Sequence, residues 1–403
     1  MKRISTAVFL LILSFSAFAQ NITPGSWRVT MDIGKGQELL FEWEISLKNG
    51  GYTFAIRNGA EKLQMDLPVI QGDSLFVRTQ VFDSEFRGKI HSPTEISGFW
   101  HDYARRKGYR IAFTAVAGAE ERRPATNIRL AETWEVRFSP GLPGEYPAVG
   151  VFEQKGAAVT GTFLTETGDY RYLDGFLKGD SLFLSTFDGA HAFHFAAKLD
   201  EEGILKGTFF SGNHYSELWT ARPNPDAKLR DPDSLTFLKP GYERLAFSFP
   251  NPEGKRVSIE DEAYRGKVVI VQILGSWCPN CMDETRQLVK WHHKYQRKGL
   301  EVIGLAYERT GDSLRSVQSI VRMKQQLEVS YEVLLAATTL DKAVASASLP
   351  MLNRVMAYPT AIYIDRQGRV RKIYTGYYGP GTGAPHDEFV EKTERFLEKL
   401  LAE

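Results

Sequence analysis

Short runs of alternating apolar and polar residues dominate the chain between Pro24 and about Pro223. Examples are Leu39 to Ile45, Leu75 to Val77 and Phe193 to Phe195, and glycine with asparagine or aspartate separates such runs, as at 48–51. Alternation with a period of two, broken by frequent turn signals, is typical of strands joined in hairpins. The pattern predicts an antiparallel all-β region over residues 20–222, folded as a barrel or a sandwich.

A faint internal repeat runs through this β region. Gly72-Asp73-Ser74-Leu75-Phe76 recurs 107 residues later, from 72 to 179, as Gly179-Asp180-Ser181-Leu182-Phe183. Phe113-Thr114-Ala115 resembles Trp219-Thr220-Ala221, which follows it by 106 residues, from 113 to 219. We expect two related β units, at about 24–125 and 140–222. The alternative is that glycine and aspartate before apolar residues form a common hairpin signal that recurs by chance.

The pattern changes after a proline-rich stretch at 223–240, which we interpret as a linker because proline resists both helices and central strands. Residues 241–403 then alternate between strand and helix patterns. Lys267 to Leu274 is an almost continuous apolar run, as expected for a central strand covered on both faces. Further strands are expected at 301–306, 331–335, 360–365 and 370–375, and helices at 279–298, 313–327, 340–347 and 387–401. This order predicts an α/β domain with a central mixed sheet and flanking helices.

The N-terminus has the pattern of a secretory signal peptide over residues 1–19. Lys2 and Arg3 precede an apolar run from Ala7 to Phe15, and Ala17-Phe18-Ala19 matches a cleavage site. The apolar run is shorter than the roughly 20 residues that a membrane-spanning helix needs. We therefore expect export to the periplasm without stable membrane insertion, the alternative being an uncleaved N-terminal anchor.

Composition narrows the possible partners and chemistry. The formal net charge is +1, with 43% hydrophobic and 25% charged residues, which gives no bulk attraction for nucleic acid. The chain has two cysteines, and both belong to one C-x-x-C unit, Cys278 and Cys281. Because a bridge across two residues would stabilise a fold very little, the pair is expected to serve chemistry.

The segment Trp277-Cys278-Pro279-Asn280-Cys281 falls where the apolar strand ends and the next helix begins. Unpaired backbone N–H groups and the helix dipole favour a thiolate at such a position. A spacing of three residues places both sulfurs on one face of the first turn. Cys278, at the exposed end of the helix, is therefore the expected nucleophile and Cys281 the resolving thiol.

Residues from about Leu245 to Leu401 resemble the thioredoxin superfamily, in particular its TlpA/ResA-like branch of thiol-disulfide oxidoreductases. The resemblance rests on the Trp-Cys-x-x-Cys unit, on the lead-in Asn251 to Lys255, and on Tyr358-Pro359-Thr360 before a strand. It implies a cis-proline loop at Pro359 that lies against the cysteines and presents backbone to the substrate. The expected substrate-contacting residues are Trp277, Pro279, Tyr358 and Pro359.

The resemblance also implies a role for Glu284, three residues after the second cysteine. In that branch a glutamate at this spacing helps proton transfer at the resolving thiol, and Gln272 stands where thioredoxin itself keeps a buried aspartate. Glu284 is thus the candidate general base. The alternative is an acidic residue favoured simply by the start of a helix.

No cofactor beyond a redox-active Cys278–Cys281 disulfide is expected, and no metal. His292 and His293 follow the cysteines, but adjacent histidines diverge on a helix and the usual zinc spacing is absent. His191, His194 and His214 are expected to be ordinary residues of the β region.

The resemblance favours a reductase that takes electrons from a membrane electron-donor protein and passes them to a disulfide-containing client protein. An oxidase or isomerase is the nearest alternative, and a client-binding adaptor whose β region carries the main function is another. The residues before Cys278 lack the Pro-x3-Thr-x2-Cys pattern of redoxin peroxidases, so antioxidant activity is not expected.

Overall fold

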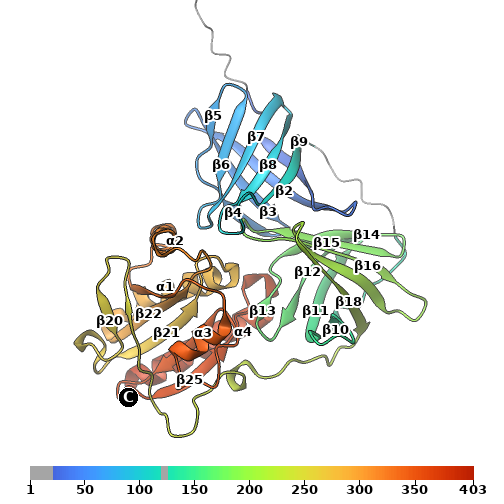
Figure 1. Ribbon diagram of the computed structural model, residues 1–403. Coiled ribbons are helices and arrows are strands. Elements are labelled where there is room, and N and C mark those ends of the chain that lie inside the picture. The colour runs from blue at the N-terminus through green and yellow to red at the C-terminus, as the bar shows by residue number, and fades with distance from the viewer. Residues whose placement is uncertain (1–20, 119–125) are drawn as a thin grey trace, which may run out of the picture.

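The computed structural model describes residues 21–118 and 126–403, which form two antiparallel β sheets followed by an α/β unit (Figure 1). The predicted signal peptide, residues 1–19, lies outside the described residues. Within the described ranges no helix is both long and apolar enough to cross a membrane.

The first nine strands form one open sheet in the order β4-β3-β2-β1-β9-β8-β7-β6-β5. Their alternating residues point into a single core around Trp27, Trp43 and Phe86, all fully buried. The strands are β1 (Gly25–Asp32), β2 (Glu38–Lys48), β3 (Gly51–Asn58), β4 (Glu61–Gln64), β5 (Val69–Gln71), β6 (Ser74–Arg78), β7 (Ser84–Ser92), β8 (Glu95–Asp102) and β9 (Arg110–Ala117).

The next nine strands form a second sheet that closes on itself. Its order is β11-β10-β18-β17-β16-β15-β14-β12-β13, and an additional pairing of β11 with β12 closes eight of these strands into a barrel. The strands are β10 (Thr133–Phe138), β11 (Tyr146–Lys155), β12 (Ala158–Thr165), β13 (Gly168–Asp169), β14 (Leu173–Lys178), β15 (Ser181–Phe187), β16 (Ala192–Leu199), β17 (Leu205–Ser211) and β18 (Tyr215–Pro223). The predicted antiparallel all-β region is confirmed, with one open sheet and one barrel.

The repeated sequences occupy equivalent places in these two sheets. Gly72-Asp73 turns between the fifth and sixth strands of the first sheet, and Gly179-Asp180 turns between the fifth and sixth strands of the second. Phe113 and Trp219 both lie on the ninth strand of their sheet. The repeats thus recur at the same places in the chain order of the strands, and the two related units stay a prediction.

The C-terminal unit has a five-stranded mixed sheet in the order β23-β22-β21-β24-β25, with β22 parallel to both β21 and β23. Alternate residues of β21 face two cores, one under α1, α2 and α4 and the other under α3 and the lead-in segment. The strands are β21 (Val268–Leu274), β22 (Leu300–Tyr307), β23 (Glu332–Ala337), β24 (Thr360–Ile364) and β25 (Val370–Thr375), after a small hairpin of β19 (Ser248–Pro250) and β20 (Arg256–Ser258). The helices are α1 (Pro279–Tyr295), α2 (Ser313–Gln326), α3 (Lys342–Ser348) and α4 (Ala384–Ala402), with short 3₁₀ turns η1 (Pro232–Ser234), η2 (Glu262–Tyr264), η3 (Gln296–Lys298) and η4 (Pro380–Thr382). The predicted thioredoxin-like fold is confirmed.

The three units pack against one another. Phe187 at the end of β15 enters the core of the first sheet, and Asn58 of that sheet exchanges two hydrogen bonds with the backbone of Phe187. Val81, in the turn after β6, is buried in the core of the α/β unit. The linker region is also held, since Asp233 pairs with Lys372 at 3.1 Å. The β region thus packs against the α/β unit that carries the two cysteines.

Candidate redox site

The two cysteines lie at the first turn of α1, directly after β21. Cys278 is the N-cap residue, and its Sγ accepts the backbone N–H of Cys281 at 3.2 Å. The Cys278 thiol also lies 3.5 Å from the carbonyl oxygen of Tyr358, to which it donates. Both cysteines are free thiols here. The strand-to-helix geometry therefore presents two sulfurs on one face, as the spacing predicts.

The structure corrects one expectation about Cys278. Sequence reasoning placed it at an exposed end of the helix, but the residue is only 6% exposed, and Cys281 is fully buried. The cause is the end of the barrel, which lies against the first turn of α1. A substrate must therefore reach Cys278 through the space between the barrel and the α/β unit.

The predicted substrate-contacting residues lie around the cysteines, and three of them, Trp277, Pro279 and Tyr358, line the pocket that leads to Cys278. Trp277 donates from its indole N–H to the carbonyl of Tyr307 and stands edge-on to the ring of Tyr358. The Tyr358–Pro359 bond is cis, as the resemblance implies. Pro359 itself is buried and is absent from the pocket wall, and its carbonyl accepts the backbone N–H of Gly376.

Glu284 lies buried beneath the cysteines with one oxygen unused. Its Oε2 accepts a hydrogen bond from Nε2 of Gln272 at 2.8 Å, while Oε1 has no partner among the described residues. The same Gln272 nitrogen lies 3.2 Å from the carbonyl oxygen of Cys281. Gln272 stands where the resemblance leads one to look for an aspartate. It therefore joins the Glu284 carboxyl to the first turn of α1, which carries Cys281.

Burial sets the protonation of both groups. Burial raises the pKa of Glu284 to about 8, and the hydrogen bond from Gln272 offsets only part of that rise. Burial, followed by the neighbouring Cys278, raises the pKa of the Cys281 thiol well above its ordinary value, and the Glu284 charge raises it further. A thiol that is hard to ionise thus stands beside a carboxyl able to exchange a proton near neutral pH.

A pocket of about 450 Å³ leads to Cys278, and the barrel forms much of its wall. The α/β unit contributes Trp277, Cys278, Pro279, Asn280, Met356 and Tyr358. The end of the barrel contributes Tyr146, Tyr170, His191 and Phe193, together with residues 165–169. Aromatic residues of the barrel thus line the pocket that holds the nucleophile, and any substrate in this pocket touches both units.

The turn between β12 and β13 docks directly on the C-x-x-C segment. Nδ2 of Asn280 donates to the carbonyl of Asp169 at 3.1 Å, and the Asp169 carboxylate accepts the backbone N–H of Gly379 at 2.6 Å. A Cβ on Gly168 would lie 2.5 Å from Nδ2 of Asn280, so the approach needs glycine. Asn280 therefore serves as the contact between the barrel and the redox site.

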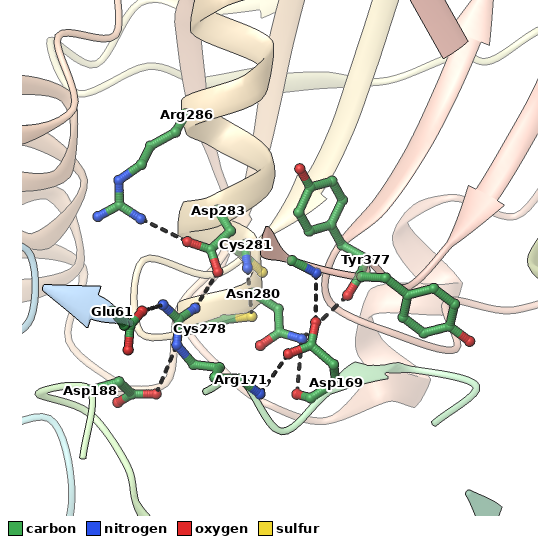
Figure 2. Close-up of polar contacts among 12 residues, drawn as sticks. Glu61, Asp169, Arg171, Asp188, Cys278, Asn280, Cys281, Asp283, Arg286 and Tyr377 are labelled. Atoms are coloured by element: carbon green, nitrogen blue, oxygen red, sulfur yellow. Dashed lines mark hydrogen bonds and ion pairs between the residues drawn. The ribbon is translucent and has the colours of Figure 1, made fainter. Parts of the chain in front are cut away.

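A buried arginine joins all three units beside the cysteines (Figure 2). Arg171, just after β13, pairs with Glu61 of the first sheet and with Asp283 of α1, and Asp188 of the barrel lies 3.7 Å from its Nε. All four side chains are at most 10% exposed. Asp283 is held on its other side by the half-exposed Arg286 at 2.9 Å. This cluster fixes the helix that carries the cysteines to both β units.

Sequence reasoning missed the barrel wall, Asn280 and the Arg171 cluster. Arg171 is separated from Glu61 by 110 residues and from Asp283 by 112, so no local pattern connects them. His191 was taken for an ordinary strand residue, but it lies in the turn before β16 and lines the pocket. His194 does lie within β16, bonded to Ser185. For these missed contacts, the sequence offered one signal, the asparagine Asn280 inside the C-x-x-C unit.

Substituting Gly168 should open the pocket. In Gly168→Ala the new methyl group would displace the β12–β13 turn from Asn280, so we expect Cys278 to react with iodoacetamide several-fold faster. Gly179→Ala is the matched control, since Gly179 also has a positive φ but a Cβ there would meet nothing within 4 Å. Equal alkylation rates in the two variants would show that the barrel does not restrict access to Cys278.

Comparison with known proteins places the C-terminal unit. Residues 240–373 match the AhpC/TSA family. The thiol-disulfide oxidoreductase ResA of Bacillus thuringiensis subsp. konkukian is 24% identical over 160 residues, covering 40% of this chain and 78% of that protein. The thioredoxin-like protein YneN of Bacillus subtilis is 24% identical over 139 residues, covering 34% of this chain and 73% of that protein. A putative thiol:disulfide interchange protein DsbE from Chlorobium tepidum has a similar structure, with 21% identity and a TM-score of 0.31, over 41% of this chain and 99% of that one.

These matches confirm the resemblance predicted from the sequence. The C-terminal unit is thioredoxin-like and similar to the ResA proteins. The chain is an enzyme of the thiol-disulfide oxidoreductase class. The matched segments lie in the C-terminal part, so they say nothing of the two β units.

Proposed function

We propose that this protein is an exported reductase, which reduces disulfides of client proteins through Cys278 and Cys281 and is itself re-reduced by a membrane electron-donor protein. The observation that carries the direction is the buried Cys281, whose thiol pKa is raised well above its ordinary value. Strongly oxidising relatives of thioredoxin owe their potential to a stabilised reduced form. Here burial disfavours the Cys281 thiolate, so ionisation of that thiol does not add to the reduced form the stabilisation that an oxidase draws on.

The proposed reaction uses each group in turn. The Cys278 thiolate attacks one sulfur of the client disulfide, and the other client sulfur leaves as a thiolate. Glu284 takes the proton of Cys281, whose thiolate attacks the Cys278 sulfur of the mixed disulfide and releases the second client thiol. The enzyme ends as a Cys278–Cys281 disulfide, having given two electrons, and the donor protein must restore the dithiol.

The barrel suggests how a client is held, and this supports one function for the whole chain rather than a separate adaptor. Tyr170 and Phe193 of the barrel line the same pocket as Cys278, so recognition and chemistry share one space. Trp277 and Tyr358 bound the same space on the α/β side. We propose that these four residues contact the client segment around its disulfide.

The reduction potential tests the direction. The protein is equilibrated in dithiothreitol or glutathione buffers and the fluorescence of Trp277, beside the sulfurs, is followed. A potential at or below roughly −220 mV supports a reductase. A value near roughly −120 mV would make the protein a disulfide-forming oxidase instead. The Cys278→Ser variant, which cannot form the disulfide, is the control for fluorescence changes unrelated to the redox pair.

A further inference from the structure

A second pocket, of about 480 Å³, lies where the three units meet on another side of Trp277. Its polar lining comes from the turn after β8, the turn between β17 and β18, and the segment from the end of β22 into α2. The residues are Arg105, Arg106, Tyr109, His214, Arg309 and Arg315. Among the described residues, none with a carboxylate lines this pocket. Its walls therefore carry four guanidinium groups from two different units.

The buried guanidinium groups are not fully compensated. Arg105 and Arg309 share one carboxylate, that of Asp102, at 2.9 Å and 3.2 Å. These two arginine side chains are 18% and 11% exposed, and Asp102 is 3% exposed. Glu308, the nearby second carboxyl, accepts from the backbone and hydroxyl of Ser276, and Arg315 shares the carboxylate of Asp83 with Arg78 and Arg322. Because these arginines outnumber the carboxylates they share, positive charge remains beside the pocket, which an additional anion would offset.

Hydrogen-bond donors line the pocket, beside the Thr310 hydroxyl, which already bonds Asp312 and Ser316. Nε of Arg309 has no partner among the described residues. Nε2 of His214 lies 2.8 Å from Arg105, which can only donate, so this nitrogen accepts. Burial and the nearby guanidinium groups lower the pKa of His214 to about 4. Its Nδ1 therefore carries the proton and donates to the Tyr109 oxygen at 3.0 Å, which leaves the Tyr109 hydroxyl hydrogen free to donate elsewhere.

We propose that this pocket is a binding site for an oxyanion, a carboxylate or phosphate group. Guanidinium groups bind both through paired, charge-assisted hydrogen bonds. The proposal does not rest on the reductase function, because the pocket is defined by its own residues. It lies beside the redox site, since the guanidinium carbon of Arg309 stands 5.6 Å from the Trp277 ring centre. The oxyanion can be a free small anion or an acidic group of a client chain.

Titration with inorganic phosphate tests the site itself. The full-length mature protein is titrated calorimetrically at constant ionic strength, and we expect saturable binding of one phosphate. Arg106→Gln, at the exposed rim, and Arg105→Gln should each weaken it by about tenfold or more. Arg137→Gln is the matched control, an exposed arginine on β10 outside the pocket. Absence of saturable binding, or equal affinity in Arg106→Gln and Arg137→Gln, would overturn the proposal.

A second measurement separates the two sources of the anion. Two synthetic disulfide peptides that differ only by glutamate or glutamine near the cysteine are compared as substrates. A higher kcat/KM for the glutamate peptide that is lost in Arg106→Gln and competed by phosphate supports an acidic group on a client. Equal kcat/KM values together with saturable phosphate binding support a free anion.

Discussion

The variant Glu284→Gln should slow disulfide exchange by about 100-fold or more near neutral pH, the usual range for loss of a general base. The amide keeps the size of the side chain and can still accept the hydrogen bond from Gln272, but it cannot take a proton from Cys281. The initial attack by Cys278 does not need this base. We therefore expect mixed disulfides to accumulate, measured by rapid acid quench and mass spectrometry.

The same substitution should make the protein more stable at alkaline pH. The folded-state pKa of Glu284 is raised to about 8 from 4.5, so the folded protein holds this proton between those values and the unfolded chain does not. Stability is therefore lost as pH rises through this window, by about 5 kcal/mol at pH 9 as an order of magnitude. Glu284→Gln removes that loss, which urea unfolding at pH 5 and pH 9 would measure.

Glu391→Gln is the matched control for both measurements, because Glu391 is an exposed glutamate on α4. It should change neither the exchange rate nor the pH dependence of unfolding. If Glu284→Gln kept a rate within threefold of the parent, the proposed proton transfer would be wrong. In that case Glu284 would be an acidic residue of the first helical turns without a role in exchange.

The variant Arg171→Met should cost about 3–5 kcal/mol of stability, the usual effect of removing one partner of a buried ion cluster. It would leave the carboxylates of Glu61, Asp188 and Asp283 buried without their shared cation. Because Arg171 joins the three units, we also expect urea unfolding to separate into more than one transition. The α/β unit should part from the β units at the lower urea concentration.

Arg286→Met provides a control at the same carboxylate. Arg286 also pairs with Asp283, but its side chain is 42% exposed, and such a pair contributes less than about 1 kcal/mol. If the two arginine variants unfolded at the same urea concentration, the cluster would not hold the units together.

The C-terminal unit was predictable because its signals are local. The apolar run that became β21, the following Trp-Cys-x-x-Cys segment and the period of α1 lie within about 30 consecutive residues. The type of each of these elements, strand or helix, is predicted by its own sequence. The positions of Cys278, Cys281 and Glu284 at the start of one helix follow from that order.

The β region was predictable only in class. A period of two predicts strands, and turn residues predict hairpins, but neither says which edges meet. The pairing of β11 with β12 closes the second sheet, while the first sheet stays open with β4 and β5 as its edges. Closure depends on how far each sheet curls, which is a property of the assembled strands.

By itself, the sequence determined the strand-to-helix turn with its two thiols and the glutamate below them, because residues three apart on a helix are neighbours in any fold. Only the tertiary structure decided that Cys278 is buried, that Tyr170 and Phe193 of the barrel line its pocket, and that Arg171 joins three units beside it. These contacts join residues about 100 positions apart. The pocket and the buried ion cluster form only when the units pack together and exclude water.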